Sequence, residues 1–252
     1  MVNSPLREVP ITKINQMVFF LIIGIAIFLR TYHLHQQEIF SYDEGYIIDR
    51  AETMHAIFSG ESAKNIFFNY IDIKIFWLWL IAAGQFVVGD AFLSAKCLTS
   101  FLGVFSVGLT FLLAKRFYRS TLVGLCSAAF LAVSSYHVFY SRMVIPDTCA
   151  ATFLLLSILC YWMGMERGKP YTILSGVSFG MAFLTHYRVL VGGVYIFIME
   201  FYQYYLARNF AESGLKKIAL RYSVFMFSTI IAVVSFVQWE QCLTGISHWA
   251  ML

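Results

Sequence analysis

Two adjacent acidic residues, Asp43 and Glu44, follow the first apolar segment of the chain within a polar stretch. Acidic side chains are costly inside a lipid bilayer, so carboxylates next to an apolar segment need a physical account. A carboxylate in this place can deprotonate an acceptor hydroxyl or amine, or orient it for attack. Asp43 equally fits the cap of the helix expected after it, because Asp is a common residue before a helical pattern.

Two later turns between apolar segments also carry charged side chains. Arg142 and Asp147 flank a proline in the first turn. His186 and Arg188 lie in the second turn. An arginine can clamp a phosphate with paired hydrogen bonds, and Asp147 can bind a sugar hydroxyl or hold a divalent cation together with Asp43. The second pair can neutralise a phosphate that remains behind as leaving group.

Each of these side chains also has a purely structural explanation. Asp147 can cap the helix after the proline, where its charge is favourable to the helix dipole. Arg188 can extend along the bilayer to the interface, and His186 can be an ordinary interfacial histidine. Lys74, close to Asp72, has the same two interpretations. The joint placement of these groups on one face of the molecule is therefore more informative than any one of them.

The composition indicates an all-α, polytopic membrane protein. The 252 residues are 60% hydrophobic and 13% charged, whereas a soluble domain has about 25% charged residues. Repeated apolar runs predict helices, because a helix satisfies its own backbone in lipid. The basic residues fall in short loops instead of on one face, which argues against nucleic-acid binding.

The apolar runs also predict the topology. Spanning helices are expected at about 14–31, 91–114, 120–140, 148–165, 171–185, 189–206 and 218–239. A further run at 71–89 is long enough to cross as well. If it crosses, the basic loop clusters fall on the side opposite the N-terminus, and if it stays at the surface they fall on the same side. The N-terminal basic residues are Arg7 and Lys13, and the loop clusters are Lys115, Arg116, Arg119, Arg167, Lys169, Arg208, Lys216, Lys217 and Arg221.

Because Lys and Arg in short loops favour the cytoplasmic side, the second arrangement is preferred. The sequence therefore predicts seven spanning helices, with the N-terminus cytoplasmic and the C-terminus outside. Residues 32–90 form an outer loop with two surface helices, one of them amphipathic at 46–58. We expect a single membrane domain over 1–252.

The order of these residues resembles the GT-C superfamily of membrane glycosyltransferases, in the branch with the protein O-mannosyltransferases and the lipid A aminoarabinose transferase. The resemblance rests on Phe28 to Leu34, Asp43-Glu44-Gly45-Tyr46, Ser94 to Leu98, Ala114 to Tyr118, Tyr140-Ser141-Arg142 with Pro146-Asp147, and Phe183 to Tyr187. The family usually has Arg where this chain has Lys96, and often Lys where it has His186. Members usually continue beyond a seventh helix. The resemblance leaves open a compact member, a fragment, or one part of a split enzyme with a further membrane subunit.

The resemblance implies an inverting transfer of a sugar from a polyprenyl-phosphate lipid to an acceptor lipid, glycan or protein at the outer face. Asp43 is the expected base, and Glu44 and Asp147 are the other acidic residues of the site. The expected substrate-binding residues are Arg142, Arg188, His186, Lys74 and Tyr46. A divalent cation held by Asp43 and Asp147 is permitted but not required.

Two other function classes remain as alternatives. A lipid-carrier transporter would have ionisable residues near the bilayer midplane and Gly- or Pro-broken helices in matched halves. The chain has only 4 prolines and shows no internal repeat, which argues against that class. In a non-catalytic membrane partner or scaffold, the acidic residues would only be solvated.

Overall fold

The computed structural model describes residues 12–36, 38–39, 41–60, 74–206 and 212–244, and within these ranges it is helical, without a strand. The all-helical class predicted from the sequence is therefore confirmed. The part of the expected outer loop at 61–73, with Asp72, lies outside the described residues. The helices are α1 (Lys13–Thr31), η1 (Leu34–Gln36), α2 (Tyr42–Phe58), α3 (Ile75–Val88), α4 (Ala91–Tyr118), α5 (Thr121–Val133), α6 (Ser135–Tyr140), α7 (Asp147–Arg167), α8 (Lys169–Thr185), η3 (Tyr187–Val189), α9 (Leu190–Leu206) and α10 (Glu212–Thr244).

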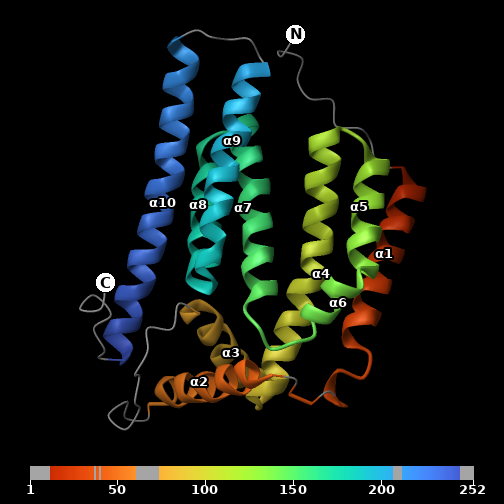
Figure 1. The fold of residues 1–252 in the computed structure, drawn as a ribbon, viewed down its shortest axis with the longest axis vertical. Coiled ribbons are helices and arrows are strands. Elements are labelled where there is room, and N and C mark those ends of the chain that lie inside the picture. The colour runs from red at the N-terminus through yellow and green to blue at the C-terminus, as the bar shows by residue number, and fades with distance from the viewer. Residues whose placement is uncertain (1–11, 37, 40, 61–73, 207–211, 245–252) are drawn as a thin grey trace.

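Most of the long helices run side by side along the longest axis of the molecule (Figure 1). They alternate in direction, with α1 at one edge and α10 at the other. Helix α2 lies across one end of this array, and α3 lies beside α2. We refer to this end, where α4 and α7 begin, as the α2 end of the molecule.

Within the described residues, four helical segments are long and apolar enough to cross a membrane. They are Lys13–Gln36, Ala91–Tyr118, Asp147–Arg167 and Lys216–Trp239. Helices α8 and α9 have 17 residues each, and α5 has 13. The crossing count of seven stays a prediction.

Helix α3, within the ambiguous run at 71–89, is buried against α2 and α4. Trp77 and Ile81 are fully buried in α3 and share a core with Ile47 and Ala51 of α2. With 14 residues and a rise of about 1.5 Å per residue, α3 is roughly 21 Å long. The helix ends at Val88 and is followed by the cap residue Gly89, whose φ of 82° only glycine adopts without strain.

The predicted helix at 120–140 requires a correction, because the structure divides it at Ser134 into α5 and α6. The ψ of 114° at Ser134 takes the chain out of the helical conformation. The break frees carbonyl groups at the end of α5, and the buried Arg30 of α1 donates to two of them. Its Nη1 lies 3.1 Å from the Ala132 oxygen, and its Nη2 lies 3.4 Å from the Leu131 oxygen. Arg30 thus replaces hydrogen bonds that the broken helix lacks.

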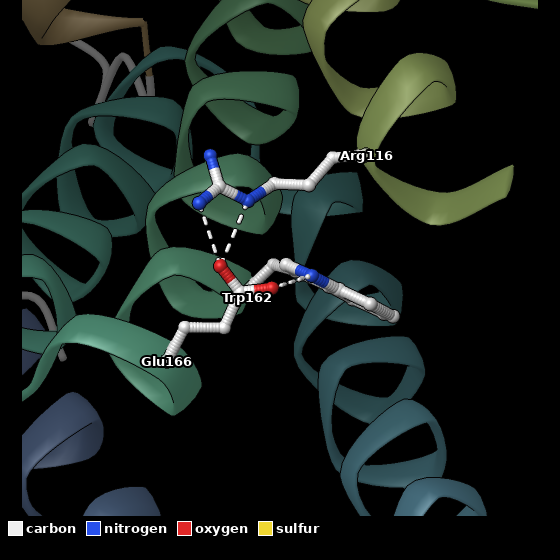
Figure 2. Close-up of polar contacts among 3 residues, drawn as sticks. All are labelled: Arg116, Trp162 and Glu166. Carbon is white, nitrogen blue, oxygen red and sulfur yellow. Dashed lines mark hydrogen bonds and ion pairs between the residues drawn. The ribbon is translucent and has the colours of Figure 1, made fainter. Parts of the chain in front are cut away.

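The opposite end of the molecule has its own polar contacts. Figure 2 shows Arg116 of α4 facing Glu166 of α7, with Nη2 and Nε of the guanidinium 2.6 and 3.0 Å from Oε2. Trp162 donates its ring N–H to the other carboxylate oxygen at 2.9 Å. Deeper in the array, Glu200 of α9 accepts from Arg221 at 2.6 Å. The Arg116 contact joins α4 to α7, and the Arg221 contact joins α10 to α9.

Candidate active site

The charged residues predicted from the sequence come from four segments that all lie at the α2 end (Figure 1). The first is the beginning of α2, and the second is the turn at 141–146 that leads into α7. The third is the turn between α8 and α9, and the fourth is the beginning of α3. More than 100 residues of sequence separate the first of these segments from the third.

Asp43 is an exposed residue in the first turn of α2. This helix begins at a capping box, in which the Ser41 hydroxyl accepts from the Glu44 backbone N–H and the Glu44 carboxylate accepts from the Ser41 N–H. Such a box satisfies two backbone donors that a helix start leaves unpaired. Because the partially positive helix start favours nearby anions, the Asp43 carboxylate is stabilised at this position.

Glu44 differs from Asp43 in its surroundings, because it is fully buried. Its Oε1 accepts a hydrogen bond of 2.6 Å from the backbone N–H of Val144, in the turn before α7. Its Oε2 accepts from Ser41 at 3.3 Å. The sequence grouped Glu44 with Asp43 as catalytic, but the structure engages both Glu44 oxygens with backbone donors.

Asp147, His186, Arg188 and Lys74 form one electrostatic group. Asp147 is exposed in the first turn of α7, and Arg188 is exposed in η3. Burial lowers the pKa of His186 below its usual value, and the positive charges of Arg188 and Lys74 lower it further. The negative charge of Asp147 acts on the His186 pKa in the opposite direction. The charges of Asp147, Arg188 and Lys74 therefore all act on the His186 side chain.

Arg142 has a backbone role that the sequence did not indicate. Its Nη1 donates to the Leu29 oxygen at 2.9 Å, and its Nη2 donates to the Tyr32 oxygen at 2.8 Å. It therefore caps the end of α1, and the partial burial that this requires lowers the pKa of its guanidinium. Phosphate binding by Arg142 stays a prediction.

Tyr46 lines a shallow, open depression of about 600 Å³ along the start of α2. Its ring also lies under the guanidinium of Arg50, 5.1 Å from the ring centre. The other lining residues are Ile39, Ser41, Tyr42, Gly45 and Asp49. Asp43 is not among the residues that line this depression.

The donor set at this end does not form a metal centre on its own. Among the described residues, no three His, Cys, Asp or Glu side chains gather in a way that could hold a metal ion. Mg²⁺ is often held by one or two carboxylates together with water and substrate phosphates. A divalent cation at Asp43 and Asp147 therefore stays a prediction.

Sequence reasoning missed the structural roles of two buried cations. Lys96 of α4 is buried, with its ammonium 4.0 Å from the centre of the Phe92 ring, and it experiences the charges of Glu44 and Arg142. Arg30 is buried as well and lies 2.7 Å from a ring nitrogen of His137. The sequence did contain a signal for these roles, namely a charged residue within or at the end of an apolar run, because such residues rarely lack a function.

Comparison with known proteins agrees with the family resemblance seen in the sequence. Positions 75–239 match the family model of the dolichyl-phosphate-mannose-protein mannosyltransferases. An uncharacterised protein of Aquifex aeolicus is 25% identical over 170 residues, which cover 66% of this chain and 34% of that protein. An undecaprenyl phosphate-alpha-4-amino-4-deoxy-L-arabinose arabinosyl transferase of Wigglesworthia glossinidia brevipalpis is 25% identical over 166 residues, or 60% of this chain and 29% of that protein.

The chain thus spans about a third of the length of the curated relatives that it matches. No solved structure matches it significantly. The matched region begins with α3 and extends into α10, so it includes the turns that carry Arg142 and His186. Because this match covers more than half of the sequence, the chain belongs to the dolichyl-phosphate-mannose-protein mannosyltransferase family, within the GT-C superfamily of membrane glycosyltransferases.

Proposed function

We propose that this chain carries the catalytic centre of a glycosyltransferase that moves a sugar from a polyprenyl-phosphate lipid to an acceptor at the α2 end. The observation that carries the proposal is the placement of Asp147, His186, Arg188 and Lys74, which come from three separate segments, at the α2 end. It joins three cationic or ionisable groups to a carboxylate from a different helix. A phosphate needs such cations, and a sugar hydroxyl or an acceptor needs a carboxylate.

The reaction requires one bond to form as another breaks. An acceptor hydroxyl or amine attacks the anomeric carbon of the sugar, and its proton passes to the carboxylate of Asp43. The bond between the anomeric carbon and the phosphate oxygen breaks, and the electron pair leaves with the polyprenyl phosphate. Attack from the side opposite the phosphate inverts the configuration at the anomeric carbon.

The cations have their largest effect where negative charge develops on the departing phosphate oxygen. Arg188 and Lys74 would stabilise this charge more in the transition state than in the bound donor, which accelerates the chemical step. A neutral His186 would donate a hydrogen bond to the phosphate. The relative from Wigglesworthia has undecaprenyl phosphate in its name, which supports a polyprenyl phosphate as the donor lipid here.

The proposed topology has seven membrane crossings, formed by α1, α4, α5 with α6, α7, α8, α9 and α10. Helices α2 and α3 would lie at the outer surface and the N-terminus in the cytoplasm. The length of α3, roughly 21 Å, supports this arrangement, because it falls short of the roughly 30 Å hydrocarbon core. Arg116, which pairs with Glu166 at the end opposite α2, is one of the basic residues predicted to be cytoplasmic, so its position supports this arrangement.

Replacement of the proposed base tests this function. Asp43→Asn keeps the size of the side chain but removes its capacity to accept a proton, so we expect sugar transfer to fall by at least about 10²-fold. The assay measures transfer from a polyprenyl-phosphate sugar by the full protein in membranes. Glu52→Gln is the matched control, because Glu52 is another exposed acidic residue of α2. Wild-type turnover by Asp43→Asn would refute the proposed role of Asp43.

A further inference from the structure

A buried side chain, that of Glu44, joins the first turn of α2 to the turn before α7. Glu44 has no exposed surface, and its two carboxylate oxygens accept from the Val144 N–H at 2.6 Å and from the Ser41 N–H at 3.3 Å. Hydrogen bonds to a charged group are stronger than those between neutral groups. The contact between Glu44 and Val144 therefore links two segments that lie 100 residues apart in the sequence.

The cation of Lys96 lies close enough to Glu44 to interact with its charge. Lys96 is only 1% exposed, so water screens this attraction weakly. Removal of the Glu44 charge would leave Lys96 buried with a less favourable electrostatic environment. The charge of Lys96, in α4, thus also favours the buried Glu44 carboxylate that links α2 to the turn before α7.

The linked backbone positions are close in sequence to both proposed acidic residues of the site. Asp43 immediately precedes Glu44, and Asp147 follows Val144 by three residues, with a proline between them that restricts the chain. We propose that Glu44 is a positioning residue, whose buried carboxylate ties the start of α2 to the turn before α7 and thereby fixes Asp43 relative to Asp147. This inference rests on the proposed function, in which Asp43 is the base.

The geometry separates this role from that of a base. A general base must come within hydrogen-bond reach of the proton that it accepts. Glu44 is inaccessible to an acceptor, and its two oxygens already bind backbone donors. Asp43, in contrast, is exposed. Of the adjacent acidic pair, only Asp43 is available to a substrate.

Three variants test the role in catalysis. Glu44→Ala removes both hydrogen bonds, and since a displacement of 1 Å in an active site can cost about 10²-fold, we expect kcat to fall by that factor. Glu44→Gln keeps the shape and one acceptor oxygen, so about a tenth of the wild-type kcat should remain. Ser41→Ala removes the hydroxyl half of the helix cap but leaves the bond to Val144, so its kcat should fall less than about threefold.

The pH profile of the residual activity distinguishes positioning from proton transfer. If Glu44 only positions Asp43, the Glu44→Gln profile keeps the same number of midpoints while its height falls, and the acidic midpoint moves only slightly down because a neighbouring negative charge is removed. Loss of a midpoint would mean that Glu44 itself titrates in the reaction, which would overturn the inference. A loss in Ser41→Ala as large as that in Glu44→Ala would also overturn it, because the effect would then come from the helix cap.

Amide hydrogen exchange measures the link without reference to activity. In Glu44→Ala, exchange in a peptide covering 141–147 should rise by at least about tenfold, since the Val144 N–H loses its acceptor. Asp43→Asn serves as the control and should leave this exchange unchanged. Unchanged exchange in Glu44→Ala would overturn the link. Full activity of Asp43→Asn would overturn the proposed function instead, so the two failures are distinguishable.

Discussion

Gly103 in α4 packs directly against the turn before α7. The space between them has no room for a side chain at position 103. A Cβ atom added to Gly103 would lie 2.4 Å from the Cβ of Ser141 and 3.0 Å from Nε of Arg30. Ordinary van der Waals contact begins at 3.4 Å, so Gly103→Ala must displace one of these groups by about 1 Å. Ser141 is fully buried, and its carbonyl accepts from the Ser100 hydroxyl at 3.4 Å, so the turn cannot easily move away.

The expected cost follows from this overlap. An extra methyl group in a well-packed interior destabilises by about 1–3 kcal/mol, which corresponds to a fall in Tm of roughly 2–12 °C for a domain of this size. The turn displaced by Gly103→Ala carries Arg142 and Asp147. A shift of 1 Å there is expected to lower transfer activity by up to about 10²-fold.

The matched control is Gly108→Ala, in the same helix, because a Cβ at Gly108 meets nothing within 4 Å. Alanine is favoured over glycine inside a helix by up to about 1 kcal/mol, so this variant should melt at or slightly above the wild-type temperature. Both variants are melted in the same detergent, and activity is measured in membranes. If Gly103→Ala is as stable and active as Gly108→Ala, the packing of α4 against the turn is not as described.

Two further predictions concern ionisable groups. Glu200→Gln should lower the free energy of unfolding by about 2–3 kcal/mol, because it breaks an ion pair whose acidic partner is only 2% exposed. Glu166→Gln should cost less than about 1 kcal/mol, since both partners of that pair are partly exposed; equal shifts of Tm would contradict this order. The lowered pKa of His186 means that the unfolded chain binds this proton more readily, so stability is lost as the pH falls below the ordinary value of 6.5. His186→Gln should therefore reduce the fall in Tm between pH 7.5 and pH 5.5, whereas His35→Gln, at an exposed position, should leave it unchanged.

The sequence predicted the features that depend on local patterns. The helical class followed from the apolar runs, and the end of α3 is readable from Gly89, followed by the helix cap Asp90. The break at Ser134 was not predictable in this way. It has neither glycine nor proline, and the carbonyls that it frees bind Arg30, about 100 residues earlier in the chain. Only the folded chain shows that such a partner is available.

The same limit applies to the candidate site. Residue types could indicate that an acidic pair and several cations have a role, and the expected topology brought them to one end of the molecule. Residue types could not separate Asp43 from Glu44, because the difference lies in the Val144 N–H that Glu44 binds. Arg142 likewise resembled a phosphate ligand, but two of its donors bind the last carbonyls of α1.

Burial divides the charged residues at the α2 end into two groups with different tasks. Where helices end within an apolar environment, their backbone groups need partners that water cannot supply. Buried Glu44 and half-buried Arg142 meet that need, since each binds the backbone of another helix end or turn. Asp43 and Asp147 are exposed at helix starts, where a carboxylate is stabilised without being enclosed. A charged residue that supports the backbone here is at least partly buried, whereas one that meets a substrate must remain accessible. This distinction supports the proposal that Asp43, and not Glu44, contacts the substrate.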